Sequence, residues 1–333
     1  MIRATFAAAI TLAAAAAAQA QTTEVPFALD WKFEGPAAPY FLAIDNGHFE
    51  AEGLDVEISA GQGSLDAIPK VATGAFPMGF ADINSLIKFL DQNPGAPVIA
   101  VMMVYDKPPF AVVGRKSLGI KGIDDIAGMT LGAPPPDGAW AQFAAFAQAN
   151  DIDMGTVTVE PVGFPTREPM LAEGEVDGVT GFSFSSYLNL VRLGVPEDDL
   201  TTILMADHGL DLYGNAIIAN TDFAEANPEV VRGFLAAVVD GTRDAIADPE
   251  AGAQAIVDRS PASDAAFEAR RLQLAIDDNI LTDAVKAGGM GDIDPDRMAR
   301  AMEQLAVSYE FQDQPAIEAI FTNAYLPEDR SLQ

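Results

Sequence analysis

The side chains that could make or break covalent bonds are few in this sequence. It has no Cys and only two His, His48 and His208, which excludes thiolate nucleophiles and thiolate metal sites. The two His are isolated, without the local spacing typical of a zinc site, and no Gly-x-Ser-x-Gly string marks a serine hydrolase. Glycine motifs for dinucleotides and nucleoside triphosphates are also missing. We therefore predict no catalytic residue, no metal site and no cofactor.

Side chains suited to holding a small molecule gather instead in short loops that follow predicted strands. Aromatic rings can stack on a planar solute, while hydroxyl, amide, carboxylate and backbone N–H groups can bind its polar edges. The predicted ligand-binding residues are Trp31, Gln62, Gly63, Ser64, Asp82, Asn84, Asp137, Gly138, Trp140, Phe164, Arg167, Phe182, Ser183, Tyr213 and Asn215.

Arg167 bears most directly on the chemistry of the solute. It is one of only 19 basic residues, and it lies just after Gly163 at the start of a predicted helix. A guanidinium there could hold a carboxylate or sulfonate through two hydrogen bonds. It could equally form a surface ion pair with Glu168 or Asp137. Both interpretations are open, and together with the aromatic rings they favour a solute that is small and either planar or anionic.

The two Trp and two of the Asp also have structural alternatives. Trp31 directly follows a predicted strand, so it could line a pocket or belong to the core, and Trp140 could line the pocket or pack between lobes. Asp82 and Asp137 are predicted to cap helices, although Asp82 could instead accept a hydrogen bond from a ligand amine. Tyr213 is assigned to the ligand because it lies in a segment that we expect at a hinge.

The charge of the chain excludes several partners. Its 49 acidic residues outnumber its 19 basic residues, which gives a formal charge of −30. Such a chain would repel the phosphates of nucleic acid and an anionic membrane surface. We therefore predict no nucleic-acid partner.

Residues 1–20 have the pattern of a cleaved secretory signal peptide. A short positive start with Arg3 precedes an alanine-rich apolar run, which ends in a small-x-small site at residues 18–20. The run could also be read as a membrane anchor, but it lies at the lower limit of spanning length. We expect a soluble periplasmic protein that begins near Gln21, with a charge of −31 and no membrane anchor.

The remaining chain predicts an α/β fold in which strands and helices alternate twice. Strands are expected at residues 25–29, 54–58 and 76–81, and again at 130–132 and 156–161, with helices between them. Ser64 and Thr166 are expected to cap two of these helices. The stretches 71–76 and 171–176 match closely, so we infer a structural repeat. Residues 221–333 are predicted to be mainly helical.

Apolar strands near residues 97–114 and 215–220 are predicted to cross between two lobes. We assign residues 21–105 plus 220–333 to a discontinuous lobe one, and residues 106–219, including hinge strands, to lobe two. Each lobe is expected to be a mostly parallel sheet flanked by helices. The strands between the lobes would act as a hinge, and the solute would bind in the cleft.

Four stretches resemble a known family: residues 27–31 (FALDW), 40–58, 120–132 and 171–179. They are similar to the solute-binding proteins of ABC importers, in the branch that binds nitrate, taurine, sulfonates and pyrimidine precursors of thiamine. The resemblance implies a two-lobed type II periplasmic-binding fold, a monomer, and a permease with its ATPase as partners. After Asp30 and Trp31 the pyrimidine branch usually continues with Pro-Asn, whereas this chain has Lys32-Phe33, so a pyrimidine is one of three expected solute types, beside a sulfonate and a carboxylate.

The resemblance also extends to a eukaryotic pyrimidine synthase, but that enzyme depends on a cysteine cluster which this chain lacks. Two other functions remain as alternatives to transport. One is a secreted hydrolase or lyase that uses Asp and His in the cleft. The other is a ligand-binding sensor subunit that serves a membrane receptor.

Overall fold

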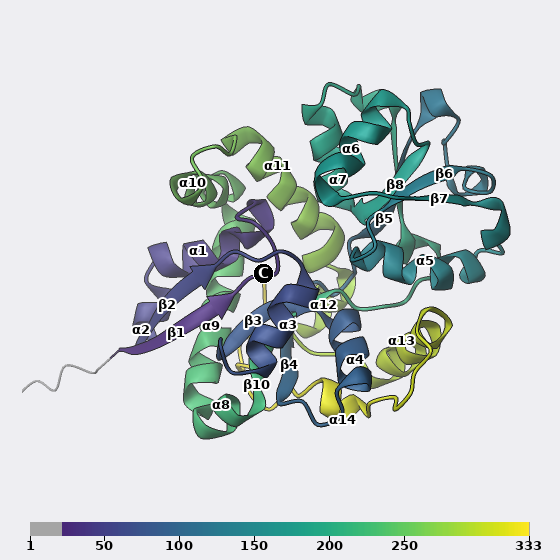
Figure 1. The fold of residues 1–333 in the computed structure, drawn as a ribbon. Helices are drawn as coiled ribbons and strands as arrows, with labels where there is room; N and C mark the ends of the chain where they lie inside the picture. Colours follow the sequence, from purple (N-terminus) through teal and green to yellow (C-terminus); the bar gives the residue numbers. More distant parts are fainter. Residues whose placement is uncertain (1–21, 333) are drawn as a thin grey trace, which may run out of the picture.

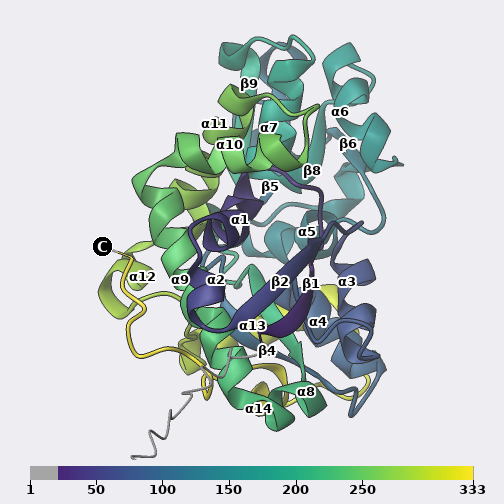
Figure 2. The same cartoon turned by 90° about the vertical axis from the view of Figure 1, so that its left-hand side faces the viewer.

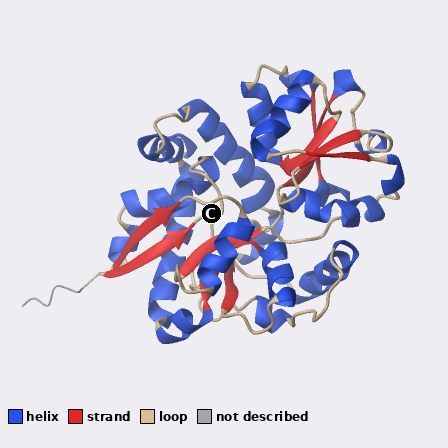
Figure 3. Ribbon diagram, viewed as in Figure 1, coloured by secondary structure: helices blue, strands red, loops and turns tan. Residues whose placement is uncertain are grey.

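Two five-stranded sheets organise the chain, one in each lobe (Figure 1). The computed structural model describes residues 22–332, so the predicted signal peptide at residues 1–20 lies outside the described part. Figure 3 shows the strands as two separate groups, each enclosed by helices. Within residues 22–332, no helix combines the length and the apolar character that are needed to cross a membrane.

The first sheet has the strand order β2-β1-β3-β10-β4. These strands are β2 (Leu54–Ser59), β1 (Thr23–Ala28), β3 (Met78–Asp82), β10 (Asn215–Asn220) and β4 (Val98–Met103). β2, β1 and β3 pair in parallel, and β10 pairs antiparallel with both β3 and β4. Only β10 therefore runs against the others. It belongs to this sheet, although its residues up to 219 fall in the segment that we assigned to lobe two.

The second sheet repeats this pattern in the order β7-β6-β8-β5-β9. Its strands are β7 (Thr158–Pro161), β6 (Thr130–Ala133), β8 (Gly178–Phe182), β5 (Phe110–Arg115) and β9 (Leu200–Leu204). Here β5 is the one antiparallel strand, in the place that β10 takes in the first sheet. The shared topology agrees with the repeat inferred from the sequence. Gly74 and Gly174, which follow equivalent helices, both adopt positive φ angles, of 74° and 76°.

Helices cover both sheets. Those in the two alternating parts are α1 (Ala38–Asp45), α2 (His48–Ala51), α3 (Ser64–Ala72), α4 (Ile83–Gln92), α5 (Gly138–Ala149), α6 (Phe164–Glu173) and α7 (Ser183–Arg192). The C-terminal helices are α8 (Thr221–Ala226), α9 (Pro228–Ala247), α10 (Pro249–Arg259), α11 (Ala265–Ala275), α12 (Asp283–Gly288), α13 (Pro295–Ser308) and α14 (Ile317–Ile320). A π-helical turn (Ile276–Ile280) follows α11, and short 3₁₀ turns lie at Gly35–Ala37, Lys116–Leu118, Ile123–Asp125, Met154–Thr156, Glu197–Asp199 and Met205–His208.

The C-terminal helices form part of both lobes rather than a separate layer. α9 packs along α1, and the ring of Phe234 on α9 lies 4.9 Å from that of Phe27 on β1. Figure 2 shows α11 beside α7 of the second lobe, and the two helices are in contact. α13 packs against α5, where the Gln142 amide donates a 2.6 Å hydrogen bond to the Tyr309 hydroxyl. The helical segment therefore joins the two lobes from outside the sheets.

The chain passes between the lobes at residues 104–109 and 205–214, and Arg297 of α13 binds both connections. Its guanidinium donates to the backbone carbonyls of Asp106 (2.7 Å) and Leu212 (2.6 Å). It also lies 3.9 Å from the centre of the Tyr213 ring. These contacts hold the two connections next to each other.

The predicted helix caps are correct at Asp82 and Asp137 and wrong at Ser64 and Thr166. α3 begins after Gly63 because the Ser64 hydroxyl is used elsewhere, donating to the Asp30 carboxylate (2.9 Å) and accepting from the Asp82 amide (2.9 Å). α6 begins three residues earlier than predicted, at Phe164, because Gly163 rather than Thr166 takes the cap position. Pro165 favours this start because proline is well tolerated in the first turn, where its missing N–H is not needed.

Candidate ligand-binding cleft

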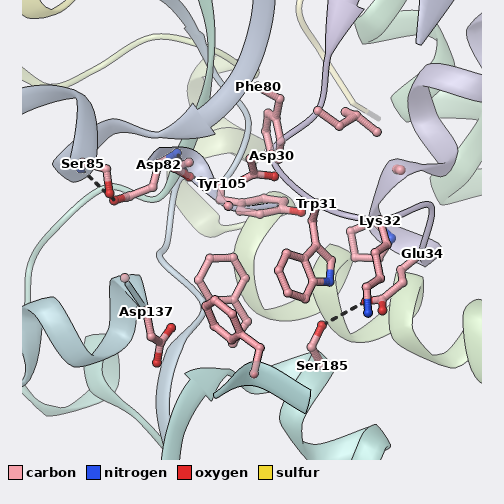
Figure 4. A pocket seen from close by; sticks show the side chains of 18 of the residues that line it. Asp30, Trp31, Lys32, Glu34, Phe80, Asp82, Ser85, Tyr105, Asp137 and Ser185 are labelled. Carbon is pink, nitrogen blue, oxygen red and sulfur yellow. Dashed lines mark hydrogen bonds between the residues drawn. The ribbon is translucent and has the colours of Figure 1, made fainter. Parts of the chain in front are cut away.

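A cavity of about 110 Å³ lies between the two lobes and is open to solvent (Figure 4). Lobe one contributes residues that follow β1, the start of α3, the end of β3 and the connection after β4. Lobe two contributes residues before α5, the first turns of α6 and the junction of β8 with α7. Most of these segments are the strand ends and helix starts that the sequence predicted, because strands that run in parallel end at one edge of their sheet.

The structure brings many of the predicted site residues to this cavity. Those that line it are Trp31, Gly63, Ser64, Asp82, Asp137, Gly138, Phe164, Arg167 and Phe182.

Three predicted residues lie directly behind the cavity wall. Asn84 is buried and donates to Asp82 Oδ1 (2.7 Å) and to the Tyr213 carbonyl (2.8 Å). Asn215 donates to Asp30 Oδ2 (2.7 Å). The Ser183 amide donates to the Pro109 carbonyl (2.8 Å), so it ties the start of α7 to the connection between the lobes.

The other three predicted residues point elsewhere. Gln62 is exposed, and Trp140 stacks on Phe143 of its own helix with ring centres 5.6 Å apart. Tyr213 faces α13, where its hydroxyl accepts from the Asp294 amide (2.8 Å). Its position near the hinge was predicted, but the side chain lies on the side away from the cavity.

Aromatic rings from both lobes form the walls of the cavity. Trp31 of lobe one meets Phe164 of lobe two edge to face, with ring centres 5.3 Å apart. Tyr105 lies 6.1 Å from Phe184, which in turn lies 5.9 Å from Phe182. Edge-to-face pairs leave ring faces available, so these walls suit a flat apolar ring.

Asp30 is a buried carboxyl at the wall of the cavity, with 8% of its surface exposed. Its Oδ2 accepts hydrogen bonds from Ser64 and Asn215, both neutral donors. Burial raises its pKa from 3.8 to about 7; the two hydrogen bonds oppose this shift, and the nearby Asp82 adds to it. Within residues 22–332 no basic side chain forms an ion pair with it, so the negative charge of Asp30 is not compensated by the protein.

A second polar group beside Asp30 has no partner in the described chain. The Tyr40 hydroxyl is buried, and no hydrogen-bond partner is found for it among residues 22–332. Tyr40 also lines the cavity, and burial raises its pKa well above 10, with Tyr105 and Asp30 adding to the shift. An unpaired buried hydroxyl is costly, so this group is available to a ligand.

The other two buried carboxyls of the cavity accept hydrogen bonds from the protein itself. Asp82 accepts from the amides of Asn84 (3.2 Å) and Ser85 (2.8 Å), and Asp137 accepts from the Thr180 hydroxyl (2.7 Å). Burial raises the pKa of both carboxyls, and the positive charge of Arg167 partly opposes this at Asp137.

Arg167 adopts the ion-pair arrangement, although this pair is buried rather than on the surface. Its Nε and Nη2 both donate to Glu168 Oε1, at 2.9 and 2.6 Å, and its Nη1 lies 3.9 Å from Asp137 Oδ2. Arg167 and Glu168 are each 5% exposed. The positive charge of Arg167 is thus already compensated inside the protein.

A buried network connects the lobes at the edge of the cavity. Arg271 of α11, 1% exposed, lies 3.1 Å from Glu34 Oε2 and donates to the Ser185 hydroxyl (3.2 Å) of α7. Its Nε donates to Glu268 Oε2 (3.2 Å). Ser185 also donates to Glu34, the contact drawn at the lower right of Figure 4.

The neighbouring residue of α11 makes a second contact between the lobes, which is exposed to solvent. Arg270 Nη2 lies 2.5 Å from Glu197 Oε2, and its hydrogen bonds lower the pKa of Glu197 to about 2.

Several cavity residues were not among those predicted from the sequence. They are Asp30, Lys32, Glu34, Tyr40, Phe80, Ser85, Tyr105, Phe184 and Ser185. Asp30 directly follows β1 beside Trp31, and Ser185 follows Ser183, so their positions at strand ends were a usable signal. Tyr40 gave none, because it lies within a helix and resembles any apolar core position.

The fold is the two-lobed type II periplasmic-binding fold, as predicted, and comparison with solved structures supports it. The aliphatic sulphonate-binding protein SsuA of Escherichia coli has a TM-score of 0.71 at 14% identity, over 91% of this chain and 99% of SsuA. The nitrate-binding protein NrtA of Synechocystis PCC 6803 has a TM-score of 0.61 at 13% identity, over 92% of this chain and 87% of NrtA.

Sequence comparison identifies the family. The model of the NMT1/THI5-like family matches residues 36–252, and the chain belongs to this family. It is 28% identical over 246 residues to the riboflavin-binding protein RibY of Chloroflexus aurantiacus, which covers 73% of this chain and 68% of RibY. It is 26% identical to the formylaminopyrimidine-binding protein of Halalkalibacterium halodurans over 233 residues, which cover 69% of this chain and 68% of that protein.

A third relative is an enzyme, the 4-amino-5-hydroxymethyl-2-methylpyrimidine phosphate synthase of Schizosaccharomyces pombe. It is 24% identical over 237 residues, which cover 68% of this chain and 67% of the synthase. The predicted resemblance to the nitrate, sulfonate and pyrimidine-precursor binders is therefore confirmed.

Proposed function

We propose that this protein is the periplasmic solute-binding component of an ABC importer, and that it captures a planar nitrogen heterocycle of pyrimidine size in the interlobe cleft. The observation that carries the proposal is a buried carboxyl without a compensating cation, Asp30, within aromatic walls contributed by both lobes. A ring that stacks on these walls and donates N–H groups to Asp30 would satisfy both features.

The charges of the cleft favour a neutral or cationic solute over an anionic one. Its lining includes four acidic residues, Asp30, Glu34, Asp82 and Asp137, but only two basic ones, Lys32 and Arg167. The guanidinium of Arg167 is already paired within the protein. A sulfonate or carboxylate would therefore enter a field that repels it.

The size of the cavity favours a single ring. An engineered protein cavity of about 150 Å³ accommodates benzene. The present cavity, about 110 Å³ and partly open to solvent, is of that order, whereas the fused three-ring system of a flavin is much larger. The relatives that bind riboflavin and formylaminopyrimidine therefore suggest the type of solute, and the volume points to the smaller of the two.

We further propose binding without catalysis. Some relatives are named as synthases, but the sequence has no Cys to supply the cysteine cluster that the resemblance implies for such enzymes. In this proposal the protein acts as a monomer in the periplasm after cleavage near Ala20, is not anchored to the membrane, and delivers its solute to a permease and its ATPase. The two lobes, with β10 counted in lobe one, would close over the solute.

Titration calorimetry with the purified mature protein tests the proposal. The probes are 4-amino-5-hydroxymethyl-2-methylpyrimidine, riboflavin, benzenesulfonate and nitrate. We expect the aminopyrimidine to bind most tightly and Asp30→Asn to weaken it by at least tenfold, whereas Asp55→Asn, an exposed change of equal charge on β2, leaves its affinity unchanged. Binding of nitrate or benzenesulfonate in preference to the pyrimidine would refute the proposed solute class.

A further inference from the structure

We propose that Glu168 is a specificity-determining residue, which keeps the cleft closed to anionic solutes by occupying the guanidinium of Arg167. The inference rests on the proposed capture of a solute in this cleft. It concerns a residue that does not line the cavity itself.

The geometry of the pair supports this role. Neighbouring residues on a helix normally point in different directions, yet Arg167 turns back so that both Nε and Nη2 bind one oxygen of Glu168. The guanidinium also lies against β8, where Gly181 makes room for it, because a Cβ at residue 181 would lie 3.0 Å from Arg167 Cζ. The phenyl ring of Phe164 covers another side, 5.5 Å from Cζ.

The pair is shielded from water, which makes its effect on charged solutes strong. Arg167 and Glu168 are each 5% exposed, and Asp137, 3.9 Å from Nη1, is also buried. In so dry a site charges interact far more strongly than they do in water. An anion that approached Arg167 would have to displace Glu168 or share the guanidinium with two carboxylates.

The other cations near the cleft do not change this balance. Arg271 is held by Glu34 and Glu268, with 1% of its surface exposed. Lys32 lines the mouth of the cavity but is exposed, so water and salt screen its charge. Of the two cations that line the cavity, Arg167 is therefore the buried one. A single substitution, at Glu168, can remove the partner that now holds its charge.

The proposal predicts that removing the charge of Glu168 creates an anion site. Glu168→Gln keeps the shape of the side chain but carries no charge, so it leaves the guanidinium of Arg167 with the more distant carboxylate of Asp137, 3.9 Å from Nη1, and frees Nε and Nη2 for an anion. Benzenesulfonate is a suitable probe because it combines one flat ring with one anionic group. We expect Glu168→Gln to bind benzenesulfonate at least tenfold more tightly than the wild type, by titration calorimetry at pH 7.

Two further variants establish the cause. Glu173→Gln, at the exposed end of the same helix, removes an equal charge and should leave benzenesulfonate binding at the wild-type level. Adding Arg167→Met to Glu168→Gln should abolish the gain. Because Asn can replace Asp as a helix cap, Asp137→Asn should fold and give a smaller gain, and it serves as the second test if Glu168→Gln does not fold.

Each outcome bears on one proposal. The specificity role of Glu168 is refuted if the wild type already binds benzenesulfonate as tightly as the folded Glu168→Gln variant does. It is equally refuted if the gain survives the loss of Arg167. Failure of the wild type to bind the aminopyrimidine, measured in the same series, would count against the proposed function and leave the role of Glu168 standing.

Discussion

Replacing Asp30 by Asn should change how the stability of the protein depends on pH. The pKa of Asp30 is raised from 3.8 to about 7 in the folded protein, mainly because the carboxyl is buried. Between these values the unfolded chain has released the proton, whereas the folded protein still holds it. The free energy of unfolding must therefore fall as pH rises through this range, and the stabilisation is complete only below pH 4.

The size of the effect follows from the shift. Each pKa unit corresponds to about 1.4 kcal/mol, so a shift of roughly three units amounts to about 4 kcal/mol between pH 4 and pH 7. Asn resembles the protonated acid, and its carbonyl oxygen can accept the hydrogen bonds that Ser64 and Asn215 now donate to Oδ2. The free energy of unfolding of the variant should match that of the wild type near pH 4 and exceed it by up to about 4 kcal/mol at pH 7.5.

Urea denaturation at four pH values between 4.5 and 7.5 measures this difference. Asp82, whose pKa is also raised by burial, titrates in both proteins, so the difference between the two curves reports Asp30 together with its interaction with Asp82. Asp55→Asn, which removes one exposed carboxylate from the same sheet, controls for the change in net charge. If the difference between Asp30→Asn and the wild type stays constant across this pH range, Asp30 is not a buried, uncompensated acid and our account of the cleft is wrong.

Three further changes probe the wall of the cleft, the contact between the lobes and a closely packed turn. Trp31→Ala should weaken aminopyrimidine binding by about fivefold, or about 1 kcal/mol, in calorimetry, whereas Trp140→Phe should not affect it, since Trp140 stacks within its own helix. Arg271→Met should lower the free energy of unfolding in urea by about 3–5 kcal/mol because it removes the cation that pairs with the buried carboxylate of Glu268. The neighbouring Arg270→Met breaks an exposed pair and should cost far less; equal losses would contradict this reasoning. Gly61→Ala should lower the free energy of unfolding in urea by about 1–3 kcal/mol, because the Cβ of the alanine would lie 2.2 Å from the Leu29 carbonyl oxygen. An unchanged stability would show that the turn at residue 61 can shift.

Local chemistry explains which parts of the site were predictable. Asp82 and Asp137 were identified as helix caps because a cap bonds backbone amides within three residues, a relation that is visible in the sequence. The pairing of Asp30 with Asn215 joins residues 185 positions apart, and no local pattern signals it. The same is true of Arg271, which was placed in a predicted helix without any indication that it would meet Glu34.

The remaining errors arise because a side chain in a loop can point to either side of the chain. A position after a strand predicts that a residue lies near the cleft, but not which way its side chain points. Trp31 faces the cavity, whereas Tyr213, in the connection between the lobes, turns to α13. Arg167 was correctly placed in the first turns of α6, and both of its possible partners were named. The burial of the pair decides how it acts on a solute. That burial depends on Gly181 and Phe164, and therefore on the packing of the whole lobe.

The position of β10 has a consequence for the order in which the chain can fold. β10 lies between β3 and β4, yet it follows them by more than a hundred residues, with the whole second sheet encoded in between. In the proposed export the chain emerges with its N-terminus first, so β1 to β4 must wait for β10 before their sheet can be completed. The second sheet has all five of its strands within residues 110–204 and faces no such delay. The second lobe can therefore assemble first. Its folding brings the two ends of its segment together, and so places β10 next to β4 and completes the first sheet.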